Sequence, residues 1–194
     1  SSCGLVGVKS SRGLVSNGPM PPSPGGLGVH GALARTVADA TALLGVLAGR
    51  DRHYLDAVFG DPGADLDSVR DLPPLRIGRY RTPVIAETDL DPEVIAAYEQ
   101  ASALLSDLGH EVLDIEVPMP RSAVPVFETV WSAIAAGIPL EPESVADLRP
   151  LTRWLRDRGR ATTATVLDAA LARMAALAQQ GLASSEHVDI VLTP

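Results

Sequence analysis

Apolar positions first recur at helical spacing between Thr36 and Ala48. Thr36 suits an N-cap, and Asp39 stands three residues later, as in a capping box. Gly49 follows the last apolar residue and suits a left-handed helix end. The pattern therefore predicts a helix over 36–48.

A strand, a helix and a second strand follow one another in the middle of the chain. The short run Leu75–Tyr80 predicts a strand, and Asp91 and Pro92 then open a helical pattern that reaches Leu108. Apolar residues next alternate over Glu111–Val117. A crossover of this length predicts parallel strands. The loop after the first strand therefore leaves a carboxyl edge where α/β sheets bind ligands, although solvated loop positions are favoured for its acidic residues.

The last third of the chain is predicted to be mainly helical. Helices are expected over 126–136 and 144–158, and from Thr162 or Thr163 to Gln180, followed by a strand over Val188–Leu192. One basic cluster lies at the end of the second of these helices, and we predict that it forms a solvated face. Its members are Arg149, Arg153, Arg156, Arg158 and Arg160.

The N-terminal stretch is apolar and rich in glycine. Short strands are predicted over Leu5–Val8 and Leu14–Ser16, with a Pro/Gly loop over 17–31 and a buried Cys3. The segment 26–31 matches G-x-G-x-x-G, which opens the alternative of a dinucleotide-binding domain. A proline cluster stands where that motif needs a strand, so this alternative is disfavoured.

Composition narrows the classes of function. The net charge of −8 argues against nucleic acid as a partner. One cysteine and four histidines give neither a disulfide framework nor a metal-ligand pattern. No apolar run of membrane-spanning length and no signal peptide is visible, so we expect a cytoplasmic protein that binds no membrane, metal or cofactor.

Two blocks in the first fifty residues, in this order and with a loop between them, carry a specific resemblance. They are Cys3-Gly4-Leu5-Val6-Gly7-Val8-Lys9-Ser10 with its continuation to Ser16, and Gly31-Ala32-Leu33-Ala34-Arg35-Thr36-Val37-Ala38-Asp39. Together they resemble the second half of the amidase signature, which defines a family of serine amidases. Ser10 and Ala32 stand where that family usually has proline.

The resemblance implies an α/β fold with a mixed sheet covered by helices, here incomplete. It also implies amide hydrolysis through an acyl-serine intermediate, with a serine, a second serine in a cis peptide and a lysine as the catalytic groups. In the family order all three precede Ser1, and Lys9 matches a different lysine. We therefore expect a central-to-late segment that carries no catalytic residue and is inactive alone.

The expected organisation is a single domain segment over 1–194. It comprises the signature half (1–50), an acidic connection (51–74), the β-α-β unit (75–117), and the helical part with the final strand (118–194). Phe127 and Trp131 lie one helical turn apart and are candidates for an apolar acyl pocket, although core packing is the favoured alternative. The expected partner is a small amide substrate, and homo-oligomerisation is left open. The alternative function is a non-catalytic remnant or partner-binding α/β module.

Overall fold

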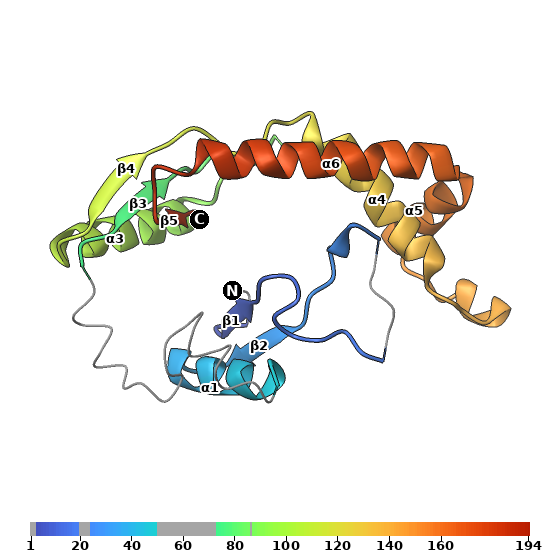
Figure 1. Ribbon diagram of the computed structural model, residues 1–194, viewed down its shortest axis with the longest axis horizontal. Helices are drawn as coiled ribbons and strands as arrows, with labels where there is room; N and C mark the ends of the chain where they lie inside the picture. Colours follow the sequence, from blue (N-terminus) through green and yellow to red (C-terminus); the bar gives the residue numbers. More distant parts are fainter. Residues whose placement is uncertain (1–2, 20–23, 50–72, 86) are drawn as a thin grey trace. The chain divides into compact units, whose positions relative to one another are not determined.

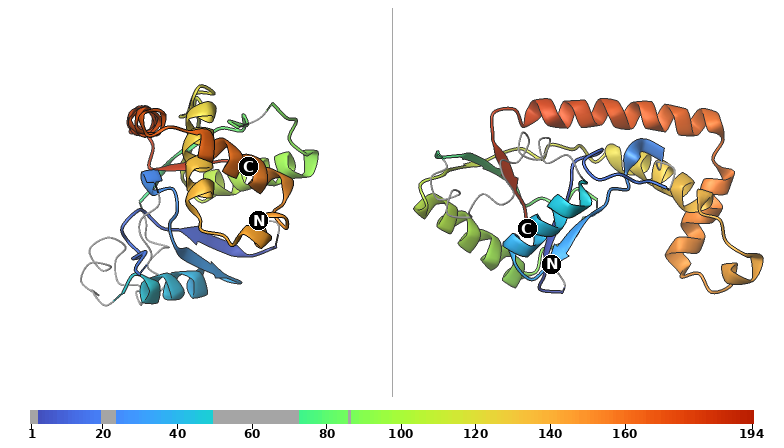
Figure 2. Two further views of the ribbon diagram at one scale, coloured as in Figure 1. Left: turned by 90° about the vertical axis from the view of Figure 1, so that its right-hand side faces the viewer. Right: turned by 60° about the horizontal axis from the view of Figure 1, so that its bottom comes forward.

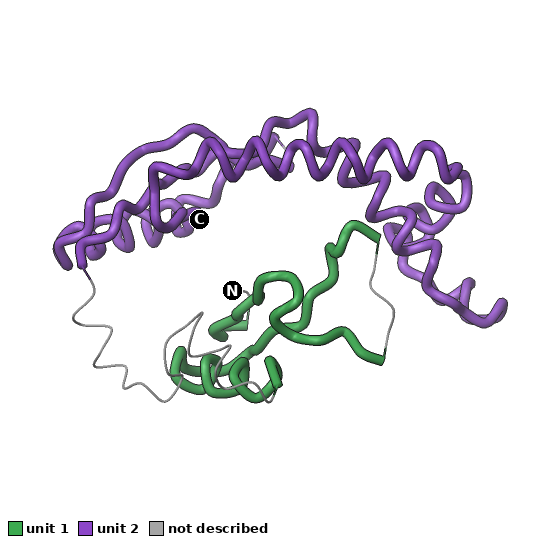
Figure 3. The backbone as a smooth tube through the Cα atoms, in the orientation of Figure 1, with its two compact units in different colours: residues 1–72 green, residues 73–194 purple. Residues whose placement is uncertain are grey.

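The chain forms two units, residues 1–72 and 73–194, each with its own sheet (Figures 1 and 3). This computed structural model describes residues 3–19, 24–49, 73–85 and 87–194. Nearly all of the predicted acidic connection lies outside these residues, so that prediction stays a prediction.

The first unit is an antiparallel strand pair followed by a helix. Strand β1 (Val6–Lys9) pairs with β2 (Gly31–Ala34), and helix α1 (Val37–Leu47) follows. The sequence predicted β1 and α1. The predicted strand over Leu14–Ser16 is wrong. These residues follow a turn at Gly13, whose φ is +84°, and place Leu14 and Val15 in the core. Strand β2 was missed because its residues follow a Pro/Gly loop and read as the head of the helix.

Close backbone contact joins β1 to β2. A Cβ on Gly31 would lie 2.0 Å from the Val8 carbonyl oxygen, so no larger residue fits there. The Ser10 hydroxyl donates a 2.8 Å hydrogen bond to the His30 carbonyl oxygen. At α1, the Thr36 side chain accepts a hydrogen bond from the Asp39 N–H, which confirms the predicted cap.

The second unit contains a parallel three-stranded sheet in the order β4-β3-β5. Strands β3 (Arg76–Arg79) and β4 (Glu111–Asp114) are joined by helix α3 (Pro92–Asp107), and β5 (Ile190–Leu192) lies on the other side of β3. The predicted β-α-β unit and its parallel strands are confirmed. The side chain of Asp91 caps α3 through the N–H of Glu93.

Four helical segments lie between β4 and β5: α4 (Ala123–Gly137), the 3-10 turn η3 (Pro142–Val145), α5 (Pro150–Ala161) and α6 (Ala164–Ser184). Figure 2 shows α6 as one long helix that leads from α5 back toward β5. The predicted helix over 144–158 is wrong at its start. Pro150 opens α5, because proline fits the first turn of a helix and breaks its interior.

The contact between α4 and α5 buries an arginine that the sequence placed in solvent. Arg156 is 5% exposed, and its Nη1 donates to the carbonyl oxygens of Ala135 (2.6 Å) and Ile138 (2.7 Å). Its guanidinium thereby caps the end of α4. Gly159 makes this crossing possible, because a Cβ there would lie 2.0 Å from the Ser132 carbonyl oxygen.

Large apolar side chains also remain exposed in both units. Among the described residues that share this feature are Leu33, Val46, Ile85, Leu104, Leu108, Leu182 and Ile190. In the part of the chain that the structure describes, no single helix is both long and apolar enough to cross a membrane.

An ion pair with additional backbone hydrogen bonds between Arg76 and Asp189 holds the start of β5 against β3. The Asp189 carboxylate accepts a 2.7 Å hydrogen bond from the Arg76 N–H and a 3.2 Å bond from its Nη2. The Asp189 N–H donates in return to the Arg76 carbonyl oxygen at 2.8 Å. These contacts join residues 113 positions apart in the sequence.

The ion pair between Arg76 and Asp189 predicts that the free energy of unfolding depends on pH. The Arg76 backbone N–H, and after it the guanidinium, lowers the pKa of Asp189 below its ordinary value of 3.8. A carboxyl group whose pKa falls on folding stabilises the fold above its unfolded pKa, and this contribution is lost as the pH falls through the folded pKa. Asp189→Asn should therefore lower the free energy of unfolding at pH 7, and the difference from the unsubstituted chain should shrink below about pH 4.

Urea unfolding at several pH values measures this difference. Asp157→Asn is the matched control, because that carboxylate is exposed and lies 3.9 Å from its partner Arg160. Equal pH profiles for the two variants would contradict the prediction.

Candidate functional site

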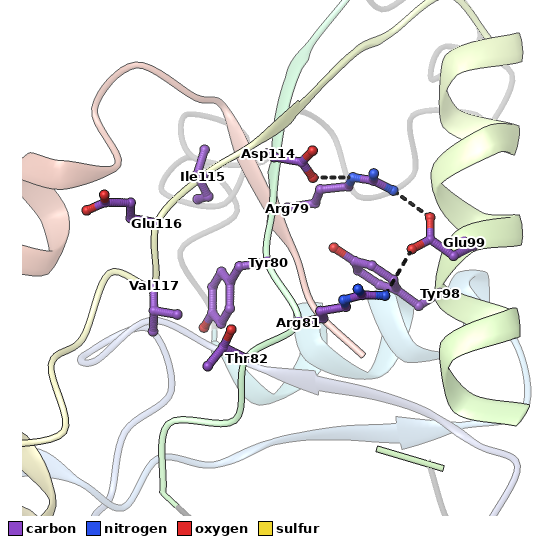
Figure 4. A pocket seen from close by; sticks show the side chains of 10 residues that line it. All are labelled: Arg79, Tyr80, Arg81, Thr82, Tyr98, Glu99, Asp114, Ile115, Glu116 and Val117. Atoms are coloured by element: carbon purple, nitrogen blue, oxygen red, sulfur yellow. Dashed lines mark hydrogen bonds and ion pairs between the residues drawn. The ribbon is translucent and has the colours of Figure 1, made fainter. Parts of the chain in front are cut away.

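A polar cavity lies at the carboxyl ends of β3 and β4, where parallel sheets commonly bind ligands (Figure 4). Its volume is ≈ 450 Å³, within the range of small-molecule sites. The sequence predicted this edge of the sheet as a ligand position. The cavity is lined by Arg79, Tyr80, Arg81, Thr82, Tyr98, Glu99, Asp114, Ile115, Glu116 and Val117.

Arg79 connects the three elements that form the cavity. Its Nε donates to Asp114 Oδ1 on β4 and its Nη1 to Glu99 Oε2 on α3, both at 2.8 Å. Its guanidinium also lies 5.7 Å from the centre of the Tyr98 ring. The hydrogen bond to Glu99, followed by that to Asp114, raises the pKa of Arg79. Arg79 is therefore permanently charged, and its Nε and Nη1 connect β3 to β4 and α3.

Arg81 is the more available of the two arginines. Its Nη1 lies 3.8 Å from Glu99 Oε1, beyond hydrogen-bond distance, and its side chain is 60% exposed against 24% for Arg79. Burial is the main cause that raises the pKa of the neighbouring Tyr98, so this phenol keeps its proton at neutral pH. The cavity thus holds one guanidinium that binds two carboxylates, one more exposed guanidinium, and the phenol groups of Tyr80 and Tyr98.

Sequence reasoning missed this cluster. Arg79 and Arg81 stand two residues apart at the end of a strand, a spacing that places both side chains on one side of an extended chain. That spacing was the available signal. Glu99 and Asp114 lie 20 and 35 residues further along and come near Arg79 through the crossover.

Phe127 and Trp131 lie together on α4. Their ring centroids are 5.7 Å apart with planes tilted by 38°, and the two side chains are 38% and 39% exposed. Neither lines the cavity at the sheet edge. The assignment of these two residues to an acyl pocket stays a prediction.

The glycine-rich block of the first unit contains backbone-directed contacts. The Lys9 Nζ donates to the Ser10 carbonyl oxygen at 3.0 Å. Cys3 is exposed, so its predicted burial is wrong.

In the G-x-G-x-x-G segment, Gly26 ends a 3-10 turn and Gly31 opens β2, whereas pyrophosphate binding needs the last glycine to open a helix. Across the described ranges, no group of three or more His, Cys, Asp or Glu side chains is placed to hold a metal ion.

The family of the chain follows from comparison with known proteins. The family model "Amidase" matches residues 1–194, and the chain belongs to that family. The α/β fold class and the resemblance to the amidase signature are thereby confirmed.

Two groups of curated relatives illustrate this membership. The chain is 33% identical to 6-aminohexanoate-cyclic-dimer hydrolase of Paenarthrobacter ureafaciens over 169 residues, which cover 78% of this chain and 32% of that protein. It is 37% identical to a glutamyl-tRNA(Gln) amidotransferase subunit of Picosynechococcus sp. over 134 residues, which cover 66% of this chain and 27% of the relative. The match therefore spans 32% and 27% of these two relatives' lengths.

Solved structures agree with the sequence comparison. The structure of 6-aminohexanoate cyclic dimer hydrolase complexed with substrate matches 96% of this chain and 41% of its own, with a TM-score of 0.66 and 26% identity. A bacterial aryl acylamidase of the amidase signature family matches 98% of this chain and 41% of its own, with a TM-score of 0.68. At 19% identity, this second likeness shows the fold alone.

The Arg79 cluster predicts a local loss of stability. Arg79→Gln removes the charged contacts to Glu99 and Asp114 together. Because the side chain is partly screened by solvent, we expect the free energy of unfolding to fall by about 1–2 kcal/mol. Arg160→Gln, at an exposed arginine of α5, should change it by less than about 0.5 kcal/mol. Chemical denaturation of both variants is the measurement, and equal losses would contradict the role of Arg79 as a connector.

Proposed function

We propose that the chain is a segment of an amidase that hydrolyses carboxylic amides through an acyl-serine intermediate, and that it carries none of the catalytic groups itself. The observation that supports this function is the family match over residues 1–194. The signature-type block in the first unit agrees with it. The name of the 6-aminohexanoate-cyclic-dimer hydrolase points to a small substrate, and we propose a small or apolar amide for the whole enzyme.

The chemistry in question has two stages. A serine oxygen attacks the amide carbonyl, the amine departs with a proton, and the acyl group remains on the serine as an ester. Water then attacks the ester and releases the acid. Both tetrahedral intermediates carry an oxyanion that backbone N–H groups stabilise. In the family order the serine, the bridging serine and the lysine lie upstream of the residue matched by Ser1, which is why we assign no catalytic residue to this chain.

An assay of amide hydrolysis and of serine labelling by the isolated chain is the direct test. We expect the purified 194-residue protein to show no amide hydrolysis and no labelling by a fluorophosphonate, because these reagents need an activated serine. Mass spectrometry after labelling measures this. A full-length relative, such as the cyclic-dimer hydrolase, serves as the positive control. A labelled serine anywhere in the chain would overturn the assignment.

We further propose that Phe127 and Trp131 contact the acyl part of the substrate. Their tilted rings lie 5.7 Å apart and are 38% and 39% exposed, which supports this role over complete burial in the core. The neighbouring α4 residues Val130 and Ser132 are fully buried. Both rings thus remain partly accessible on a helix whose neighbouring residues are buried.

Tryptophan fluorescence tests the aromatic pair without turnover. Trp154→Phe leaves Trp131 as the single tryptophan, and titration with hexanamide should change its emission. Phe127→Ala in this background should weaken the response about threefold or more, because an aromatic pair contributes beyond its buried area. Leu182→Ala, at an exposed apolar position on α6, is the control and should leave the titration unchanged. An unchanged titration of the Phe127 variant would remove the pair from the proposed pocket.

The second candidate is a non-catalytic, partner-binding module in the cytoplasm. The exposed Leu43, Val46 and Leu47 side chains favour it, because their spacing places them together on α1 and grouped apolar surface commonly marks contact sites. Size-exclusion chromatography and dye binding, with and without the coexpressed upstream portion of a relative, separate the two candidates. Complementation that restores turnover supports the amidase segment, and tight binding without turnover supports the module.

A further inference from the structure

Arg156 carries a buried charge that the proposed amide chemistry does not use. The residue is 5% exposed, and among the described residues it forms no ion pair with a carboxylate. Its Nη1 instead donates to the carbonyl oxygens of Ala135 at 2.6 Å and Ile138 at 2.7 Å. The carbonyl end of a helix carries a partial negative charge that stabilises a cation there. The charge of Arg156 is therefore compensated by the end of α4.

The Arg156 contacts hold a helix end whose carbonyl groups need a partner. Helix α4 ends at Gly137, and the last four carbonyl groups of an α-helix have no N–H partner within the helix. Ala135 is one of these four and is 8% exposed, so water cannot readily replace the arginine as its donor. One nitrogen atom thus binds two carbonyl groups three residues apart, which fixes the end of α4 against α5.

The Phe127–Trp131 pair lies directly before the helix end that Arg156 holds. Trp131 precedes Ala135 by four residues, and Phe127 precedes Trp131 by four, so about one helical turn separates each position from the next. The two ring centroids are 5.7 Å apart. Because both rings are attached to these turns, their distance and exposure depend on the backbone that Arg156 fixes.

A second contact of α5 lies beside Trp131. Ser132 is fully buried, and a Cβ at Gly159 would lie 2.0 Å from its carbonyl oxygen, so the two helix backbones touch here. Arg156 precedes Gly159 by three residues, about one turn of α5. Its hydrogen bond to the Ala135 carbonyl oxygen therefore keeps the helices together close to this crossing.

We propose that Arg156 is a positioning residue for the Phe127–Trp131 pair, because it holds the turns of α4 that carry both rings. The proposal rests on the proposed function in one respect, namely that these rings contact the acyl part of the substrate. Arg156 is itself buried, so it acts through the rings and does not touch the substrate. Its loss should loosen the ring pair and thereby weaken the binding of an apolar acyl group.

Quenching of Trp131 fluorescence by acrylamide tests the positioning without a substrate. In the Trp154→Phe background, Trp131 is the single tryptophan. Arg156→Met should raise its quenching constant about twofold, because a buried charged contact at the helix end is lost. Arg156→Lys should restore part of the protection, since an ammonium group keeps the charge and three donors. An unchanged quenching constant in Arg156→Met would overturn the proposal.

Two variants separate positioning from a general loss of stability. Arg153→Met removes a similar contact elsewhere, because the Arg153 Nη2 donates to the carbonyl oxygens of Ala146 and Leu148 at 2.9 and 3.4 Å. Ile77→Val shortens a buried side chain of β3 and lowers stability away from α4. Both should leave the quenching of Trp131 unchanged under conditions where circular dichroism shows every variant folded. An equal increase in these variants and in Arg156→Met would reject the positioning role.

Titration with hexanamide distinguishes failure of this proposal from failure of the acyl pocket. Where hexanamide changes the Trp131 emission, Arg156→Met should weaken its apparent affinity about threefold, as expected when an aromatic contact is loosened. If hexanamide changes the emission of no variant, the acyl pocket is wrong. The quenching constants, which need no ligand, then still decide whether Arg156 positions the rings.

Discussion

The second unit depends on how strand β3 is held by its two arginines. Arg76 binds Asp189 at the start of β5, and Arg79 binds Asp114 on β4 and Glu99 on α3. A central strand of four residues makes few backbone hydrogen bonds, so these side-chain contacts fix its neighbours on both sides. The same contacts join segments that lie from 20 to 113 residues apart. The contacts of Arg79 lie at the carboxyl edge, where they hold together the three elements that line the cavity.

Local signals in the sequence were sufficient for much of this fold. Thr36 and Asp91 cap helices as predicted, since a short polar side chain satisfies free N–H groups at a helix start. The errors arose where long-range packing or a proline determines the local structure. Pro150 shortened the predicted helix, and the Arg156 guanidinium found carbonyl oxygens on a helix that its own sequence neighbourhood does not reveal. Strand β2 forms because β1 is available as its partner.

The candidate site was predictable in position more than in composition. A β-α-β pattern locates a carboxyl edge, because crossover geometry is nearly invariant. Which side chains meet at that edge depends on register, and the pairing of Arg79 with Asp114 follows from the alignment of Arg76 with Glu111. A shift of one residue would place Leu113 beside Arg79 and remove the ion pair. Register of this kind is set by the whole sheet and is hidden from inspection of either strand.

Two arginines of similar sequence context thus have different roles, and exposure with contact geometry separates them. Arg79 is the less exposed, and its Nε and Nη1 donate to two carboxylates, so its role is structural. Arg81 lies further from Glu99, at 3.8 Å, lines the cavity and is 60% exposed. Because Glu99 is already neutralised by Arg79, the charge of Arg81 is only partly compensated. Loss of the Arg81 side chain would therefore leave in place the contacts by which Arg79 joins β3 to β4 and α3.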